Sequence, residues 1–308
     1  MPSSFASEVK AEIAHLDVPN QCCRVAELAA LLRMGAVVTL GANKAMGLVF
    51  TTENAAVARR VLRLLKEIGD IRTTITVRRS RRLMKHNSYS VEVQRSPKVP
   101  EMLQSLGIWK EGSLNIGTDS AILRKTCCCA SYLRGAFLGG GSVNRPDAQY
   151  HLELDSVSYS FADLMYKLLR HMGLPAGITE RKSGYVVYLK EGDSILDFLE
   201  MVGADSAAEK FEIARNLKEV RNQVNRLVNC ETANLQKSVD AAGRQLEAIN
   251  RIKESGCYDG LSEILRETAE ARLLNPEAPL SELGQILHVG KSGINHRMRK
   301  LLKIAEEI

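Results

Sequence analysis

Two segments of this 308-residue chain, residues 22–35 and 127–140, follow the same pattern. Both begin with adjacent cysteines, consist mainly of small and apolar residues, and end at a glycine. Each predicts a helix, and each is followed by the same series of predicted elements. An internal repeat constrains the fold more than any other sequence feature, because both halves must then form the same supersecondary unit.

The elements predicted after the two helices match in type and order. Alternating apolar and polar residues predict hairpins, whereas apolar residues at helical spacing that end at Gly69 and Gly173 predict amphipathic helices. The matched pairs are hairpins over 37–50 and 142–154, helices over 52–69 and 156–173, hairpins over 71–93 and 178–190, and short helices over 100–106 and 195–201. The order is therefore αββαββα, twice.

A duplicated αββαββα unit predicts an α+β domain with internal pseudo-two-fold symmetry. The two repeated helices would pack against each other at the axis, because their small residues let the two backbones approach closely. These small residues are Ala29, Ala30, Gly135, Ala136 and Gly139. Since the duplication supplies both helices, we expect this domain to be complete within one chain and the protein to be a monomer.

The helix pair resembles the signature helices of LAGLIDADG homing endonucleases, whose two sheets form a saddle over DNA. Residues 133–141 follow the nine-letter signature in type, and residues 28–36 follow it less closely. That family places a metal-binding acid at the eighth position, which here is Gly35 and Gly140. Glycine offers no ligand to the divalent metal that phosphodiester cleavage requires. The resemblance therefore implies the fold without the catalysis or the metal.

Carboxylates near these positions are interpreted as ordinary solvated surface groups. They are Glu27, Glu53, Asp147, Glu153 and Asp155. The seven cysteines, at positions 22, 23, 127, 128, 129, 230 and 257, are interpreted as small reduced core residues. Adjacent cysteines on a helix point about 100° apart, so neither cluster can act by itself as a metal clamp. We expect no cofactor.

The second hairpin of the first repeat is basic. Residues 71–91 contain no acid, and a run of arginines falls where the turn is expected. Guanidinium groups there suit phosphate contacts, because each bonds two phosphate oxygens; the alternative is a solvated basic loop. The candidate contacts are Arg78, Arg79, Arg81, Arg82 and Lys85. The second repeat offers only Arg181, Lys182 and Lys190 in the corresponding place.

The last third of the chain is predicted to be helical, over 211–215, 220–227, 233–252 and 261–274. Residues 280–304 then follow a helix-turn-helix pattern, in which Gly284 replaces the commoner alanine and His288 the commoner turn glycine. Ser292 is expected to cap the second helix, and Gly293 to allow close approach of its backbone. The alternative is an amphipathic helix with a solvated basic face.

A recognition helix exposes hydrogen-bonding side chains to base edges and flanking cations to phosphates. Asn295 can bond adenine in a bidentate manner, and Arg299 lies one turn further along the same face. The expected DNA-binding residues are Lys291, Ser292, Gly293, Asn295, His296, Arg299, Lys300 and Lys303. The polar segment 221–235 supplies three further candidates, Arg221, Asn225 and Arg226, which could instead organise the junction between domains.

Residues 225–235, the stretch 133–143 and the terminal helix-turn-helix together resemble WhiA proteins along essentially the whole chain. The resemblance implies a bacterial DNA-binding transcription regulator, linked to sporulation in actinobacteria and elsewhere to cell division and chromosome segregation. It also implies a degenerate LAGLIDADG-like domain. Double-stranded DNA is the expected partner, and a second transcription regulator or RNA polymerase is a further candidate.

These patterns predict three regions. Residues 1–204 form the degenerate domain, with repeats over about 1–108 and 109–204; residues 205–220 form a linker; and residues 221–308 form a helical DNA-binding domain. The net charge of +6 lies in the first region, because residues 205–308 contain 16 basic and 16 acidic residues. We expect no membrane segment or signal peptide and a cytoplasmic, nucleoid-associated protein. Two other functions remain open: a metal-dependent homing endonuclease, and a protein-interaction module with secondary DNA contact.

Overall fold

The predicted duplication is present in the computed structural model, which describes residues 4–41, 45–69, 71–79, 87–110, 112–115 and 121–308. The chain forms two compact units, Met1–Lys218 and Glu219–Ile308. The elements of the N-terminal unit are α1 (Phe5–Ala14), α2 (Gln21–Gly35), β1 (Ala36–Leu40), β2 (Met46–Thr52), α3 (Ala55–Gly69), β3 (Thr73–Arg79), β4 (Asn87–Ser96), α4 (Lys98–Ser105), β5 (Trp109–Lys110), β6 (Ser113–Leu114), α5 (Thr126–Gly140), β7 (Gly141–Val143), β8 (Leu152–Ser156), α6 (Tyr159–His171), β9 (Gly177–Arg181), β10 (Gly184–Leu189) and α7 (Gly192–Val202).

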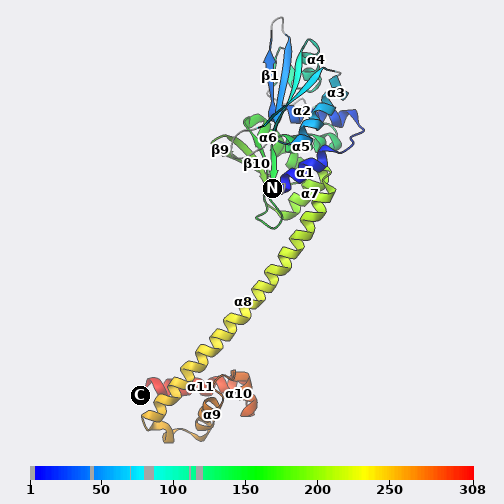
Figure 1. Ribbon diagram of the computed structural model, residues 1–308. Coiled ribbons are helices and arrows are strands. Elements are labelled where there is room, and N and C mark those ends of the chain that lie inside the picture. The colour runs from blue at the N-terminus through cyan, green and yellow to red at the C-terminus, as the bar shows by residue number, and fades with distance from the viewer. Residues whose placement is uncertain (1–3, 42–44, 70, 80–86, 111, 116–120) are drawn as a thin grey trace. The chain divides into compact units, whose positions relative to one another are not determined.

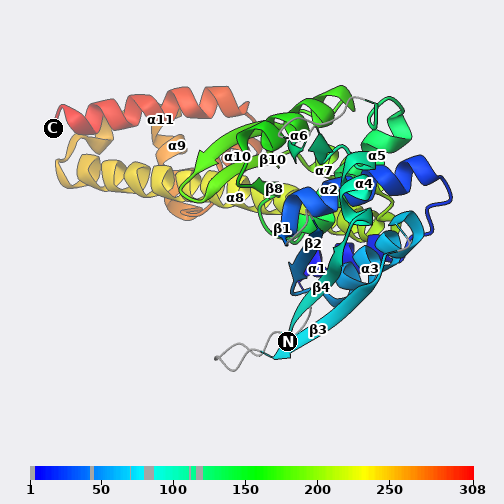
Figure 2. The ribbon, with the colours of Figure 1, turned by 90° about the horizontal axis from the view of Figure 1, so that it is seen from above.

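The two repeats have the same sheet topology. The first sheet has the antiparallel order β1-β2-β4-β3, and the second has the equivalent order β7-β8-β10-β9. Helix α3 packs on one face of the first sheet, and α6 packs on the corresponding face of the second. Figures 1 and 2 show the sheets as two separate sets of strands, blue to cyan and green. The predicted order αββαββα is therefore confirmed in both halves, with the short β5–β6 hairpin between them.

Helices α2 and α5 pack against each other at the pseudo-symmetry axis, as their small residues predict. A side chain at Gly135 would place its Cβ 2.2 Å from the carbonyl oxygen of Glu27. At Gly139 the Cβ would lie 2.5 Å from the Cβ of Met34. Glycine is required at both positions because any larger residue would push the two helices apart.

One sequence interpretation is wrong: Glu27 is not a surface carboxylate. It lies on α2 with 0% of its surface exposed, and Arg60, 2% exposed, donates to both of its oxygens at 2.6 and 2.8 Å. Arg134 of α5 also approaches it, with 3.3 Å between Nη1 and Oε2. The helical spacing gives no indication of this burial, because the two arginines that make it tolerable come from other elements.

The interpretation of the cysteines as core residues is confirmed only in part. Cys23, Cys128 and Cys129 are buried, whereas the other four are solvent-accessible: Cys22, Cys127, Cys230 and Cys257. The first residue of each adjacent pair faces away from the core because neighbouring helical side chains point about 100° apart.

The C-terminal part of the chain is helical. Its elements are α8 (Asp205–Glu254), a short 3-10 helix (Cys257–Gly260), α9 (Glu263–Leu274), α10 (Leu280–Ile286) and α11 (Lys291–Glu306). The three helical segments predicted before residue 253 are one continuous helix of 50 residues, α8, which also contains the predicted linker 205–220. Among the described helices, none is both long and apolar enough to cross a membrane.

The C-terminal unit has a hydrophobic core of its own. Three residues near the end of α8, Ala248, Ile249 and Ile252, pack with α9, α10 and α11. From the last two helices come Leu283, Ile294, Met298 and Leu301. The predicted all-α helix-turn-helix domain is therefore confirmed.

Candidate nucleic-acid interface

The turn between α10 and α11 accounts for one departure from the usual helix-turn-helix pattern, Gly284, and strains the other, His288. His288 has a φ of 50°, and it is the only non-glycine residue with positive φ in the described part of the chain. The amide of Val289 donates to the carbonyl of Gly284 at 2.8 Å. A Cβ at Gly284 would lie 2.5 Å from the carbonyl oxygen of Val289, so this tight turn requires glycine there.

Helix α11 has one buried face and one exposed basic face. Ile294, Met298, Leu301 and Ala305 are buried. Of the predicted DNA-binding residues, Gly293 and Asn295 are half-buried, and the exposed ones are Lys291, Ser292, His296, Arg299, Lys300 and Lys303. The helix therefore presents cations and hydrogen-bonding groups on the face opposite its core.

Two details of the start of α11 differ from expectation. Ser292 is not the cap, because the N-cap position is Gly290, which has no side chain to accept a hydrogen bond. A Cβ at Gly293 would lie 2.5 Å from Cγ1 of Val289, so packing against the turn is sufficient to require this glycine. Both Ser292 and Gly293 nevertheless lie in the first turn of α11, the part of a recognition helix that approaches base edges.

A buried arginine that sequence reasoning missed holds the loop before α10. Arg272 of α9 is 1% exposed, and its Nη1 donates to the carbonyls of Asn275, Pro276 and Ala278, the last at 2.6 Å. Burial lowers the pKa of its guanidinium. The sequence offered one indication of this role: Arg272 is a basic residue on the apolar side of the helix predicted over 261–274. Arg272 thus positions the segment from which the helix-turn-helix begins.

The basic cluster of the first sheet begins on a strand and not in a turn. Arg78 and Arg79 are the last two residues of β3 and both are exposed, whereas Arg81, Arg82 and Lys85 lie outside the described residues. The strand continues further than predicted because β4 pairs with it as far as Arg79, opposite Asn87. Successive strand residues point to opposite faces, so Arg78 and Arg79 lie on opposite sides of the sheet.

Arg78 shares its face of the sheet with a row of hydroxyl groups. Thr76 lies opposite Ser90, and Ser90 lies opposite Thr51, with 3.4 Å between the Thr51 and Ser90 hydroxyl oxygens. Helix α3 covers the other face, on which Phe50 and Val91 are buried. The outer face of the first sheet thus carries a guanidinium and short hydrogen-bonding side chains, which can all bind phosphate oxygens, together with one exposed carboxylate, Glu92, opposite Thr74.

The corresponding face of the second sheet is different in charge. Glu153 and Asp155 of β8 lie on it, and Arg181 bonds Glu153 at 2.8 Å and approaches Asp155 at 4.0 Å. His151 also contacts Glu153, with 3.2 Å between Nε2 and Oε2. The guanidinium of Arg181 is therefore neutralised by neighbouring carboxylates, so this face is less suited to phosphate than the first.

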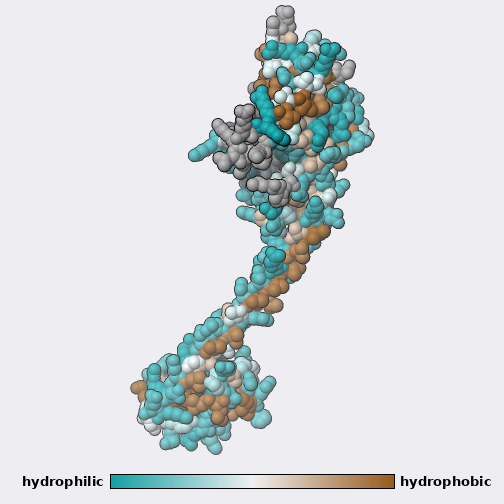
Figure 3. Space-filling model, in the orientation of Figure 1, coloured by the Kyte–Doolittle hydropathy of each residue, from teal (hydrophilic) through white to brown (hydrophobic). Residues whose placement is uncertain are grey.

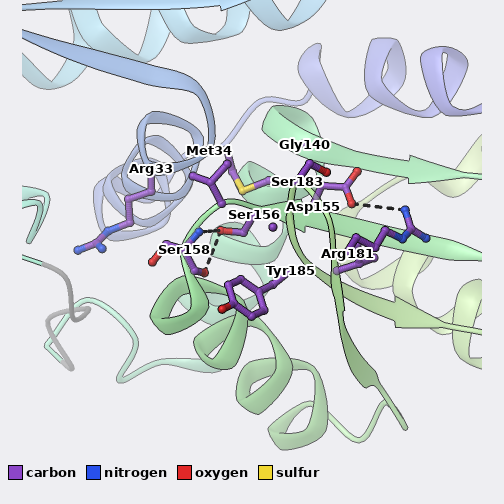
Figure 4. Close-up of a pocket in the computed structure, with 12 residues that line it drawn as sticks. Arg33, Met34, Gly140, Asp155, Ser156, Ser158, Arg181, Ser183 and Tyr185 are labelled. Carbon is purple, nitrogen blue, oxygen red and sulfur yellow. Dashed lines mark hydrogen bonds and ion pairs between the residues drawn. The ribbon is translucent and has the colours of Figure 1, made fainter.

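The ends of the axial helices line a pocket of about 410 Å³, shown in Figure 4. Met34 lies against Gly140, and a Cβ added at Gly140 would be 2.1 Å from Cε of Met34. A Cβ added at Gly35 would be 2.9 Å from Cε2 of Phe50. Among the described residues that line the pocket, Asp155 is the only carboxylate. Its burial raises its pKa most, and the negative charge of Glu153 raises it further. The helix ends thus carry no acids at Gly35 and Gly140, so they lack the ligands of the divalent-metal site of a homing endonuclease.

The remaining candidates are on α8. Arg221, Asn225 and Arg226 are all exposed, in the part of the helix that belongs to the C-terminal unit. Their exposure makes them accessible to a ligand, and their role stays a prediction.

Three family models match nearly the whole chain. A WhiA N-terminal LAGLIDADG-like domain matches residues 21–109, a WhiA LAGLIDADG-like domain matches 129–221, and the WhiA C-terminal HTH domain matches 224–305. The chain belongs to the WhiA family. The family resemblance identified from the sequence is therefore confirmed, and the degenerate helix ends lie within LAGLIDADG-like domains of WhiA type.

Relatives and solved structures agree with this assignment. A probable cell division protein WhiA from Heliobacterium modesticaldum is 45% identical over 98% of this chain and 96% of its own length. One from Desulfitobacterium hafniense is 47% identical over 99% and 96%. The crystal structure of full-length DUF199/WhiA from Thermatoga maritima is similar at a TM-score of 0.59 and 27% identity, covering 99% of both chains.

Proposed function

We propose that this WhiA-family chain is a sequence-specific regulator that binds double-stranded DNA through α11 and does not cleave it. The observation that carries the proposal is the exposed face of α11, where Arg299 and Lys300 follow His296 on a helix whose opposite face is anchored in the core. A rigid helix with exposed donors and flanking cations is the arrangement that reads base edges in the major groove.

The N-terminal unit is proposed as an accessory DNA contact. Arg78 and the hydroxyl row of Thr51, Thr76 and Ser90 lie on one face of the first sheet, and these groups bind the phosphate backbone irrespective of sequence. The paired Arg181 makes the second sheet a weaker contributor.

The ends of the two axial helices lack the groups that cleavage would need. Gly35 and Gly140 supply no oxygen ligand, and Met34 occupies the space beside Gly140. Phosphodiester hydrolysis of the homing-endonuclease kind needs carboxylates that hold a divalent ion at the scissile phosphate. The homing-endonuclease alternative is therefore disfavoured.

The relatives' names suggest the process in which this chain takes part. Both relatives compared above are named probable cell division proteins, and we propose the same role here, with action on DNA in the cytoplasm as a monomer. A second regulator or RNA polymerase is the proposed protein partner. If the chain were instead a protein-interaction module with secondary DNA contact, its role in the cell would not require DNA binding.

The experiment compares two variants on two duplexes over a range of salt concentrations. One duplex is selected from a random library with the wild-type chain, and the other is a scrambled sequence of the same composition. Arg299→Ala should weaken binding to the selected duplex by about 5- to 150-fold, because a good bidentate base contact contributes about 1–3 kcal/mol of discrimination. Binding to the scrambled duplex should change much less.

Arg78→Ala should instead weaken binding to both duplexes alike. The slope of log K against log salt should become shallower by about 0.9 for each phosphate that the variant no longer neutralises. The matched control is Arg59→Ala, an exposed arginine of α3, which covers the other face of the same sheet. The same duplexes, incubated with Mg²⁺ or Mn²⁺, should remain intact.

Several results would contradict the proposal. Failure to select any preferred duplex would exclude sequence-specific binding, and reproducible cleavage by highly purified protein would exclude a non-catalytic role. If Arg78→Ala lost the preference for the selected duplex while Arg299→Ala kept it, the N-terminal unit would be the part that reads the sequence.

A further inference from the structure

Four cysteines from the two repeats meet at one end of the axial helices. The Sγ atoms of Cys22, Cys23, Cys127 and Cys128 all lie within 4.8 Å of one another. Cys129 is not part of this group: its thiol donates to the carbonyl of Leu123 at 3.3 Å. Neither adjacent pair can surround a metal ion alone, but the packing of α2 against α5 brings the two pairs together.

The position of the four cysteines follows from the pseudo-symmetry. Cys22 and Cys23 are the second and third residues of α2, and Cys127 and Cys128 are the second and third residues of α5. The close approach of the helices at Gly135 fixes their separation further along. The cluster therefore consists of two pairs of equivalent positions, each pair with one member from each repeat, and is not a chance contact of surface residues.

The position of the four cysteines at two helix N-termini suits negatively charged sulfur. All four residues lie in the first turn of a helix, where the helix dipole stabilises thiolate, and neither first turn contains an acidic residue. A hydrogen bond from the Cys128 thiol and the nearby charge of Lys125 lower the pKa of Cys22. Burial raises the pKa of both Cys23 and Cys128, which opposes thiolate in the metal-free protein, so the case for a metal rests on the geometry of the four sulfurs.

We propose that Cys22, Cys23, Cys127 and Cys128 form a tetrathiolate Zn²⁺ site that joins the N-terminal ends of the two axial helices. Zinc–sulfur bonds of about 2.3 Å place tetrahedral sulfurs about 3.8 Å apart, so the four thiols need to contract by about 1 Å at most. Four cysteine ligands close the coordination sphere, as in structural zinc sites. The exposed Cys22 and Cys127 provide the route by which the ion enters.

This site is separate from the degenerate endonuclease centre. Thirteen residues of helix separate Cys22 from Gly35, which corresponds to about 20 Å at 1.5 Å per residue. The ion would cross-link the two repeats, and none of its four ligands is a residue proposed to bind DNA. The inference therefore stands or fails independently of the proposed function.

The test uses the full chain, reduced, stripped of metal with a chelator, and titrated with Co²⁺ and then Zn²⁺. One equivalent of Co²⁺ should give the thiolate-to-metal charge-transfer and visible bands of a tetrahedral sulfur site, and Zn²⁺ should abolish them. Cys22→Ser/Cys127→Ser should lose these bands and bind no zinc. Both substituted side chains are exposed, so the fold should be retained, which circular dichroism checks.

Matched controls are Cys129→Ser, the adjacent buried cysteine outside the cluster, and Cys230→Ser/Cys257→Ser in the other unit. Both should bind one equivalent of metal. Zinc should also raise the melting temperature of the wild type and of the controls, but not that of Cys22→Ser/Cys127→Ser. The fluorescence of Trp109, the only tryptophan of the chain, reports this temperature.

Three outcomes would overturn the proposal: no sulfur–cobalt bands in the folded wild type, bands that persist in Cys22→Ser/Cys127→Ser, or disulfide bonds among the four cysteines in protein freshly isolated from cells. The last outcome would identify the cluster as an oxidised cross-link and not a metal site.

Discussion

Glu27 shows how one side chain can join parts of the fold that the sequence presents as separate. Its carboxylate receives hydrogen bonds from Arg60 of α3 and is approached by Arg134 of α5, whose Nε donates to the carbonyl of Val202 at 2.6 Å. The network thus connects α2 and α3 of the first repeat with α5 and the end of α7 in the second repeat. A buried charge of this kind is tolerated only while all its partners are present.

Replacing Glu27 by Gln removes the negative charge and leaves two guanidinium groups without their counter-ion. We expect the free energy of unfolding of the N-terminal unit to fall by about 3–5 kcal/mol, as when one member of a buried ion pair is removed. Urea titration followed by Trp109 fluorescence measures it. The matched control is Glu67→Gln, whose partner Arg24 lies 3.6 Å away in a partly exposed pair. That change should cost at most about 1 kcal/mol. Equal effects of the two changes would mean that the Glu27 network does not hold the unit together.

At the scale of elements, the short connection between α10 and α11 is under local strain. His288 adopts the left-handed region at φ 50°, which is unfavourable for a residue with a Cβ. The turn retains this conformation because the Val289 amide bonds Gly284 and the flanking helices are anchored in the core.

His288→Gly should stabilise the C-terminal unit by up to about 1 kcal/mol. Relief of the left-handed strain, about 1–2 kcal/mol, exceeds the additional entropy that glycine gains in the unfolded chain. Hydrogen exchange of the α11 amides measures the change. His288→Ala removes the imidazole but keeps the Cβ, so it should not stabilise the unit. If alanine stabilises as much as glycine, the imidazole and not the backbone is the source of the strain.

Helix α8 is the element that sequence reasoning divided incorrectly. Its polar residues led to three separate predicted segments, but the helix contains no proline and only one glycine, Gly243, so nothing stops it before Glu254. It exposes apolar side chains at spacings of three and four, visible as brown along its surface in Figure 3. They include Ile213, Leu217, Val220, Val224 and Leu227.

At the scale of the whole molecule, the two units have separate hydrophobic cores. The N-terminal core is built around α2 and α5, and the C-terminal core contains no member before Ala248 among the described residues. A domain with its own core can fold alone, although a unit of this size is only marginally stable.

A fragment of residues 240–308 should therefore fold without the rest of the chain. It includes Ala242 and Gln245, the first buried residues of this part of α8, and every member of the C-terminal core. Circular dichroism should show a cooperative thermal transition, and Met298→Ala should lower its midpoint because it leaves a cavity in the core. A non-cooperative fragment, together with protected α11 amides in the full chain, would show that the C-terminal unit depends on the N-terminal one.

Local patterns were sufficient for the duplication and for the order of its elements, but not for the length of α8. Apolar periodicity, glycine stops and hairpin alternation depend on neighbouring residues, and they predicted the order αββαββα twice and the helix-turn-helix. The replacement of acids by Gly35 and Gly140 was also visible in the sequence, since it needs only the alignment of two helices with a known signature.

Contacts between distant segments could be decided only by the tertiary structure. The burial of Glu27, the position of Met34 beside Gly140 and the meeting of four cysteines each require two helices to be placed with a particular face and register. Periodicity identifies which face of a helix is apolar, but it does not specify which residue of the partner helix that face meets. Side chains that are unremarkable on one helix acquire a charge partner, a steric role or a shared metal site only when the second helix is packed against the first.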